Sequence, residues 1–183
     1  MKKVLTLIIF ITILSSCKDD KNTEKTSIDT TEAIKYDNIF RVSFNLIIKK
    51  DDNLHVYYTE DGTLNFNEQK TVWLPIKGSE NPQNVTFSLP ENVIPTHLRV
   101  DFGYGKNVEQ SDVDLKTFSI KYYDKKIEAK GIDILKYFYP FEAKTSILPG
   151  TSILRRFKKD QETGPILYPH ILLSQKIKEI TKG

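Results

Sequence analysis

The sequence predicts an all-β protein, an antiparallel β-sandwich that ends in a short C-terminal helix. From residue 38 onward, apolar residues alternate with polar ones at a period of two, which is typical of strands with one buried face. Glycine, proline, asparagine and aspartate interrupt the alternation at intervals of roughly ten to fifteen residues, the spacing of short strands joined by turns. About 145 residues follow this point, enough for one domain with its own hydrophobic core.

Residues 1–16 have the pattern of a secretory signal peptide. Two lysines precede an apolar run from Val4 to Leu14, and two serines follow it. As a helix this run would extend about 16 Å, which is too short to cross about 30 Å of hydrocarbon. The sequence therefore predicts that the protein is exported and that these residues are removed.

Residues 14–17, LSSC, resemble the lipobox of bacterial lipoproteins. The resemblance implies that the thiol of Cys17 receives a diacylglyceryl group, that cleavage occurs just before it, and that the new amine is acylated. Two or three acyl chains suffice for a stable membrane anchor. The alternatives are a secreted protein with an unmodified cysteine and an uncleaved anchor.

Residues 18–20, KDD, resemble the export tag of surface lipoproteins of the Bacteroidota, so the expected location is the outer membrane, at the cell surface. The alternative is that they belong to a solvated tether. Residues 17–37 are charged and rich in threonine, and we expect a lipidated, disordered tether before a domain at residues 38–183. Without residues 1–16 the net charge falls from +3 to +1, too little to draw the domain to nucleic acid.

The alternation predicts seven strands, each with its apolar residues on one face and its polar residues on the other. Pro75, Pro82, Pro90 and Pro95 lie at strand edges or in connections, where a missing N–H is tolerated. A turn is expected at residues 51–53, between the first two strands. The strands are expected at residues 40–48, 54–59, 72–76, 85–89, 98–102, 118–122 and 127–129.

The last third of the chain is less regular. Residues 132–138 predict a short helix, and residues 152–157 predict one more strand. Pairs of proline with glycine or tyrosine punctuate the segments around them, which are predicted as loops. Leu173, Ile177 and Ile180 recur at helical spacing, so the C-terminus is expected to close the domain with an amphipathic helix.

Three stretches within residues 39–123 carry a family resemblance: HVYYTEDGTLNFNEQKTVWLPIKG, VTFSLP and HLRVDFG. They look like the jelly-roll accessory modules found beside bacterial cell-envelope glycosyltransferases and other carbohydrate-active proteins. Those modules show an aromatic strand, an acidic-glycine turn, an FNE segment, an LP strand end and an LRxD strand. The resemblance implies a jelly-roll sandwich with a carbohydrate-binding-like role.

No residue set in the sequence indicates catalysis, and we expect no enzymatic activity, no metal and no cofactor. The three histidines lie far apart and lack the spacing of metal ligands. The sequence contains neither a G-x-S-x-G motif nor a phosphate-binding glycine loop. A calcium site from Asp51, Asp52 and Asp101 is conceivable in a jelly roll, but the spacing is not diagnostic.

Four residues are candidates for binding a ligand. Trp73 has the parity opposite to the buried residues of its strand, as has Tyr57 of the preceding strand, so the two share an outward face if the strands are neighbours. Aromatic rings there can stack on the apolar face of a sugar, and Arg99 and Asp101, outward on a later strand, can read its hydroxyl groups. The alternative is that a second layer, such as the C-terminal region, covers these rings, which is the more common fate of a lone tryptophan.

Residues 155–159, RRFKK, form a dense basic cluster. Such a cluster suits the phosphates of lipopolysaccharide or an acidic glycan, although a charge run is more often a solvated loop. The sequence thus predicts a non-catalytic outer-membrane lipoprotein whose carbohydrate-binding-like sandwich binds a glycan. The alternative is an envelope structural or assembly protein that binds another protein through its sandwich.

Overall fold

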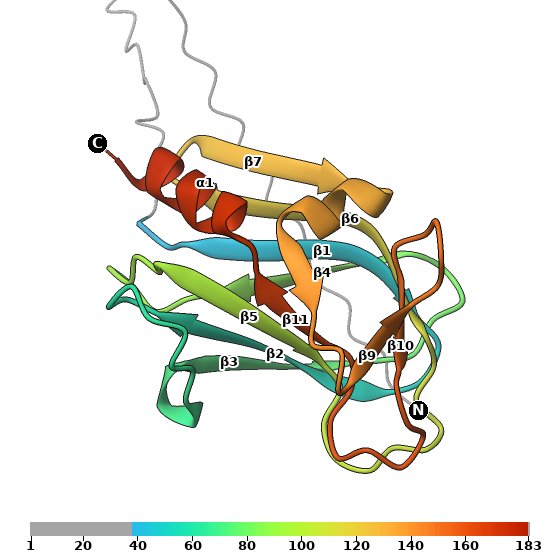
Figure 1. Ribbon diagram of the computed structural model, residues 1–183. Coiled ribbons are helices and arrows are strands. Elements are labelled where there is room, and N and C mark those ends of the chain that lie inside the picture. Colours follow the sequence, from blue (N-terminus) through green and yellow to red (C-terminus); the bar gives the residue numbers. More distant parts are fainter. Residues whose placement is uncertain (1–37, 183) are drawn as a thin grey trace, which may run out of the picture. The chain divides into compact units, whose positions relative to one another are not determined.

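The computed structural model describes residues 38–182. The predictions for residues 1–37, including lipidation at Cys17, lie outside the described residues. Within residues 38–182 the chain forms two antiparallel β-sheets, accompanied by one short α-helix near the C-terminus (Figure 1). This confirms the predicted antiparallel β-sandwich with a short C-terminal helix. The same residues contain no helix that is long and apolar enough to cross a membrane.

The larger sheet has six strands, in the order β4-β1-β6-β10-β9, with β7 also paired to β6 (Figure 1). β10 pairs with the first residues of β6, Val113 and Asp114, whereas β7 pairs with residues 117–122 of the same strand. The six strands are β1 (Arg41–Ile48), β4 (Gln83–Ser88), β6 (Val113–Tyr122), β7 (Lys125–Lys130), β9 (Thr145–Ile147) and β10 (Ile153–Arg156).

The second sheet has five strands, in the order β3-β2-β5-β11-β8, and every neighbouring pair is antiparallel. β3 is an edge strand, which is where a proline such as Pro75 is tolerated. The 3₁₀ helix η1 (Glu68–Lys70) leads into it. The five strands are β2 (Asp52–Thr59), β3 (Thr71–Ile76), β5 (His97–Phe102), β8 (Phe138–Pro140) and β11 (Ile166–Pro169).

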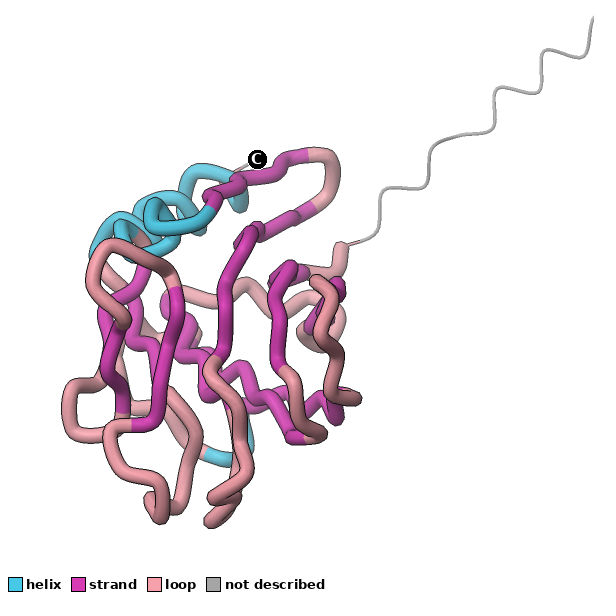
Figure 2. Tube along the Cα trace, turned by 90° about the vertical axis from the view of Figure 1, so that its right-hand side faces the viewer, coloured by secondary structure: helices cyan, strands magenta, loops and turns pink. Residues whose placement is uncertain are grey.

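The C-terminal helix α1 (Ile171–Thr181) closes the core between the sheets. Its Leu173, Ile177 and Ile180 are buried against the core residues, which confirms the predicted amphipathic helix. Figure 2 shows α1 together with the 3₁₀ helix η2 (Gly131–Lys136) at one corner of the molecule. The helix therefore covers apolar surface that the strands alone leave open.

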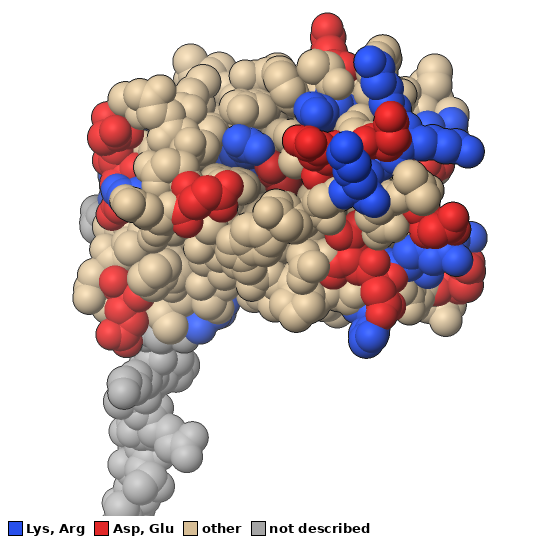
Figure 3. Space-filling model, turned by 90° about the horizontal axis from the view of Figure 1, so that it is seen from below, with Lys and Arg blue, Asp and Glu red and all other residues tan. Residues whose placement is uncertain are grey.

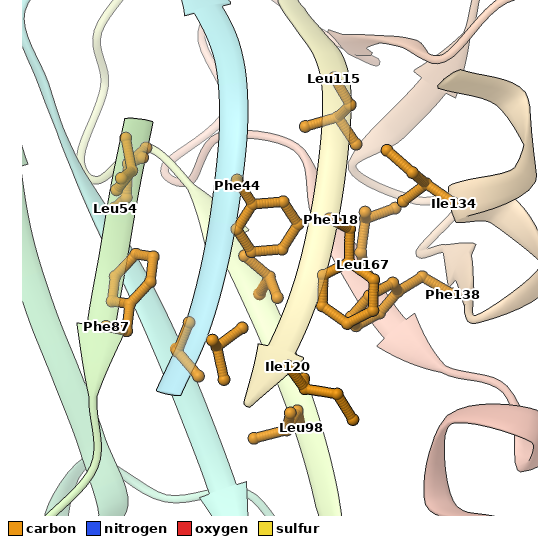
Figure 4. Close-up of a cluster of buried hydrophobic side chains, with 14 of the residues drawn as sticks. Phe44, Leu54, Phe87, Leu98, Leu115, Phe118, Ile120, Ile134, Phe138 and Leu167 are labelled. Atoms are coloured by element: carbon orange, nitrogen blue, oxygen red, sulfur yellow. The ribbon is translucent and has the colours of Figure 1, made fainter. Parts of the chain in front are cut away.

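The core lies between the two sheets and is built from the inward side chains of both. In β1, buried residues alternate strictly with half-buried ones. Phe44 of β1 meets Phe102 of β5 edge-to-face, with 5.6 Å between ring centroids, and lies 5.3 Å from Phe118 of β6. Figure 4 shows Phe44 and Phe118 side by side within the cluster of buried apolar side chains. The period-two pattern of the sequence is thus the pattern of the core.

The last third of the chain agrees with the predictions in part. The strand predicted at residues 152–157 is β10, and the short helix predicted at residues 132–138 is the 3₁₀ helix η2, which ends earlier, at Lys136, because Phe138 begins β8. The Phe138 ring is fully buried, with 5.0 Å between its centroid and that of Phe118. It lies there because the chain changes from helix to strand between Lys136 and Phe138. β9 and β11 lie in segments predicted as loops, because three or four residues are too few for an alternation to show. β2 also begins earlier than predicted, at Asp52.

Candidate functional site

The outer face of the five-stranded sheet carries aromatic side chains on neighbouring strands. The outward residues of β2 include His55 and Tyr57, and the register places His55 opposite Trp73 of β3. Tyr168 of β11 lies opposite Tyr139 of β8. β2 and β3 lie below β1 and β6 in Figure 1, so the view from below in Figure 3 looks toward this sheet. Uncharged side chains occupy most of that view, and charged ones lie toward both ends, most densely at the right.

At the β3 end of the sheet, three rings are in contact. The indole of Trp73 lies against the imidazole of His55, with 3.3 Å between ring centroids, and meets Tyr104 at 4.9 Å with an interplanar angle of 73°. Tyr104 belongs to the loop after β5, and its backbone N–H donates to the carboxylate of Asp52 at 3.1 Å. His55 is 1% exposed, whereas Trp73 and Tyr104 are 42% and 58% exposed. This end therefore presents two rings to solvent beside a buried histidine.

In the middle of the sheet, Arg99 of β5 connects the aromatic groups. Its guanidinium lies 4.7 Å from the ring centroid of Tyr57 and 5.3 Å from that of Tyr168, as in cation–π contacts. The same guanidinium donates two hydrogen bonds to Asp101, at 2.8 and 2.5 Å. The Tyr57 hydroxyl donates to Glu68 of η1 at 2.7 Å. Each polar group in the middle is thus held by a neighbour, which fixes the positions of the rings.

At the β8 end, Tyr168 is the centre of a second group of rings. It stacks on Tyr139 with 5.9 Å between centroids, and lies 5.7 Å from Phe141 and 5.8 Å from Phe66. Tyr139 also contacts His170, at 5.0 Å. Tyr139 and Phe141 are 37% and 40% exposed. This end is therefore a second group of accessible aromatic rings.

These contacts form one continuous row across all five strands. His55 and Tyr57 lie 6.2 Å apart and join the β3 end to the middle, and Arg99 joins the middle to the β8 end. With about 4.8 Å between neighbouring strands, the row is about 19 Å wide. We call this set the aromatic face; it consists of Tyr104, Trp73, His55, Tyr57, Arg99, Tyr168, Phe66, Tyr139, Phe141 and His170.

Burial sets the protonation states within the aromatic face. It lowers the pKa of His55 to about 4, so the imidazole is neutral at pH 7, and its Nε2 has no hydrogen-bond partner among the described residues. Burial also raises the pKa of Tyr57, and its hydrogen bond to Glu68 acts in the same direction. For Asp101, burial raises the pKa and the Arg99 guanidinium opposes that effect. The buried part of the aromatic face therefore holds a neutral histidine and an ion pair, in which the charges of Arg99 and Asp101 compensate each other.

The four candidate residues predicted from sequence all lie on this outward side. β2 and β3 are neighbours, so Trp73 and Tyr57 share a face as predicted. The alternative prediction, that a second layer covers the rings, is wrong for Trp73, because the C-terminal segment joins the sheet as β11. Tyr57 is 5% exposed and Asp101 2%. These two residues therefore position Arg99 and the neighbouring rings and offer little surface of their own.

Sequence reasoning missed the half of the face near β8. Tyr139, Phe141 and Tyr168 lie outside the strands that the alternation predicts, as does Tyr104 at the β3 end. A weak signal was present in the pair Phe138 and Tyr139, where a buried ring is followed by an outward one. Because β8 spans three residues, its membership of the sheet depends on a partner strand that the local sequence does not reveal.

The carboxylates considered for calcium make other contacts. Asp51 pairs with Lys77 at 2.5 Å, Asp52 accepts hydrogen bonds from the backbone N–H groups of Asn53 and Tyr104, and Asp101 pairs with Arg99. No group of three or more metal-ligating side chains occurs among residues 38–182. Each of these aspartates therefore has a structural role in the fold.

The two arginines of the basic cluster at residues 155–159 also make contacts within the protein. Arg155 makes a bidentate ion pair with Asp112, with N–O distances from 2.6 to 3.2 Å. Arg156 donates to the backbone carbonyls of Gln161 and Gly105, at 2.9 and 3.1 Å. These contacts favour a structural role for the two arginines over the binding of phosphate.

A scan against protein-family models and searches of curated proteins and of solved structures found no match to this chain. Within the described residues, the protein is a β-sandwich with an aromatic outer face on one of its two sheets.

Proposed function

We propose that the protein is a glycan-binding protein that takes an extended carbohydrate chain across the aromatic face. The observation that carries this proposal is the continuous row of rings across five strands, with exposed aromatic residues at both ends. Contiguous exposed apolar surface of this kind marks binding sites. A sugar ring has an apolar C–H face that can pack on an aromatic ring, and polar edges that need hydrogen-bond partners.

The width of the face favours an oligosaccharide over a single sugar. Trp73 and Tyr104 are exposed at one end, and Tyr139 and Phe141 are exposed at the other. Because these pairs are separated by about 19 Å, four strand spacings, one small ring cannot contact both. A ligand that uses both ends must therefore be a chain of several sugar units.

Polar groups beside the rings can hold the sugar's hydroxyl groups. The Arg99 side chain is 19% exposed, and a guanidinium has five N–H donors, of which two bind Asp101. Glu68 is exposed, and one of its oxygens accepts from Tyr57. These carboxylates hold Tyr57 and Arg99 in place, which supports a binding role over acid–base catalysis.

We also propose that the protein is a lipoprotein anchored at Cys17 in the outer membrane, with the sandwich at the cell surface. The support is the sequence LSSC-KDD at residues 14–20. Cys17→Ser should abolish the incorporation of labelled fatty acid and leave the precursor uncleaved. Normal processing and labelling of this variant would show the lipid anchor to be wrong.

A glycan array probed with the chain from residue 18 onward tests the glycan-binding proposal. We expect binding to an extended oligosaccharide, and a loss of at least about tenfold in affinity for both Trp73→Ala and Tyr139→Ala, because each removes a stacking ring. Phe157→Ala is the matched control: this ring is 58% exposed but follows β10 of the other sheet.

Two results would contradict the proposal. The first is that the unmodified chain binds no glycan on an array that covers neutral and acidic polysaccharides. The second is that Phe157→Ala weakens binding as much as Trp73→Ala does. Either result would favour the alternative function, in which the sandwich binds another envelope protein.

A further inference from the structure

The outer face of the six-stranded sheet is hollowed into a polar trough of about 700 Å³. Outward side chains of four neighbouring strands, β4, β1, β6 and β7, line it. The trough belongs to the opposite sheet from the aromatic face and shares no residue with it. Its chemistry is different as well, because its lining is polar and charged where the aromatic face carries rings.

The floor of the trough consists of small polar side chains in two rows that cross the strands. In both rows, residues of β4, β1 and β6 lie opposite one another. The hydroxyls of the first row are 2.9 Å apart between β1 and β4, and an amide-to-amide bond of 2.8 Å joins the same strands in the second. Hydroxyls and amides both donate and accept, so each retains further hydrogen-bonding positions. The rows are Thr86, Ser43 and Ser119, and then Asn84, Asn45 and Thr117.

A third row, at one end of the trough, is cationic. The register places Arg41 of β1 opposite Lys121 of β6, and Lys121 opposite Lys126 of β7. Like charges directly opposite on neighbouring strands destabilise a sheet. Lys126 and Lys130 share Glu128, at 2.5 and 3.3 Å, and Glu128 is the one acidic residue among those that line the trough. The lining therefore carries a net positive charge of three.

We propose that this trough binds an anionic oligosaccharide, with a carboxylate or phosphate group at the row of Arg41, Lys121 and Lys126 and sugar hydroxyls on the floor. The cations attract the negative group, and their mutual repulsion decreases when it binds. The floor residues supply donors and acceptors to hydroxyl groups, which act as both. Their side chains are all short and polar, so the floor offers no apolar anchor point of the kind on which protein interfaces depend.

The same anionic sugar chemistry can come from two sources. One is the carboxylates of a free acidic polysaccharide, and the other is the phosphorylated saccharide of a lipopolysaccharide. The proposal concerns the shared chemistry, and separate probes distinguish the sources. Oligogalacturonate represents the first source, lipopolysaccharide micelles represent the second, and uncharged oligogalactose is the neutral comparison.

Calorimetric titration of the full chain in a non-ionic detergent, at low salt, tests the cationic row. At least one anionic probe should bind, more weakly as salt rises, and oligogalactose should not. Replacing both Lys121 and Lys126 with alanine should weaken binding at least about tenfold. The control is Lys116→Ala, on the same strand but outside the trough, where the lysine pairs with Asp114 at 2.7 Å; it should change affinity less than about twofold.

The absence of binding to both anionic probes would overturn the proposal. So would an equal loss in the Lys116 variant, because that would indicate attraction to diffuse charge. Circular dichroism of each variant verifies that the sheet is intact, which is expected because the replaced side chains are exposed.

A second comparison tests whether the floor recognises sugar. Thr117→Val removes one hydroxyl and keeps a β-branched side chain suited to a strand. It should weaken binding of the anionic saccharide several-fold, and should leave the inhibition constant of inorganic phosphate at the same site unchanged. An unchanged saccharide affinity would limit the site to simple anions and overturn the saccharide assignment. Trp73→Ala should have no effect on this site, so its result is separable from that of the aromatic face.

Discussion

The two outer faces of the sandwich use the same alternation of residues in different ways. On the five-stranded sheet, His55, Tyr57 and Asp101 point away from the core and are still at most 5% exposed, because outward side chains pack on one another. On the six-stranded sheet, Ser43 and Lys126 contact single neighbours across or along the strands and stay accessible. Outward residues on the first face therefore contribute to stability, whereas those on the second stay accessible to solvent.

The largest expected difference lies between two arginine–aspartate pairs. Arg99→Ala leaves the carboxylate of Asp101, 2% exposed, without its partner, and we expect the free energy of unfolding to fall by about 3–5 kcal/mol. Arg155 pairs with Asp112 at 2.6 Å, but both side chains are well exposed, so Arg155→Ala should change stability little. Urea unfolding followed by the fluorescence of Trp73 measures both. Equal losses in the two variants would remove the contrast between the faces.

A second, smaller difference between the two faces, in their contribution to folding stability, should emerge as the pH falls. Burial lowers the pKa of His55 to about 4, whereas a histidine of the unfolded chain titrates near 6.5. Between these values the unfolded state takes up a proton that the folded state does not, so stability present above pH 6.5 is lost as the pH falls toward 4. The lining of the trough contains no histidine and has no counterpart to this effect.

His55→Phe isolates this contribution, because it keeps a ring beside Trp73 and removes the titrating group. As the pH falls from 7 to 5, the urea midpoint of the unmodified chain should fall relative to that of the variant, because only the unmodified chain contains this histidine. If the variant is the less stable at pH 7, the two midpoints should therefore converge or cross. A difference that stays constant across this range would show that His55 is not the group responsible.

The smallest expected change in stability concerns the six-stranded sheet, where a substitution should stabilise the protein instead of destabilising it. Lys121→Thr relieves repulsion from Arg41 and Lys126 and introduces a residue that suits a strand. We expect the thermal midpoint to rise by about 1 °C at low salt and the gain to disappear at high salt. Scanning fluorimetry measures this, with Lys116→Thr as the control that should not rise. A lower midpoint for the Lys121 variant would mean that the cationic row also contributes to packing.

The length of an element decided whether the sequence could predict it. β1 and β2 are eight residues long, and their alternation of apolar and polar residues is evident in the sequence. β6 has ten residues, but only its part at residues 118–122 was predicted, because a register shift opposite Asn45 and Leu46 interrupts its alternation. β8 and β9 have three residues each, and they are strands because of the partners with which they pair. The short helix predicted at residues 132–138 is present as a 3₁₀ helix that ends at Lys136, because the burial of Phe138 at the start of β8 outweighs local preference.

The candidate sites show the same limit. Parity alone identified the outward positions of Trp73 and Tyr57 and the placement of both on one face. Parity could not reveal that Arg41 and Lys121, eighty residues apart in the sequence, lie opposite each other in neighbouring strands. The cationic row therefore depends on a pairing between distant segments, and such pairings are not encoded in local patterns.

The position of β11 in the five-stranded sheet has a consequence for the order of folding. β5 pairs with β2 on one side. Its other side pairs with β11, which is synthesised more than sixty residues after β5. Pairing between segments so distant in the chain forms slowly. Until then, an incomplete chain exposes the unpaired edge of β5, and such edges recruit other chains into aggregates. β11 and α1 thus protect the chain against aggregation, because β11 covers the edge of β5 and α1 then covers the core.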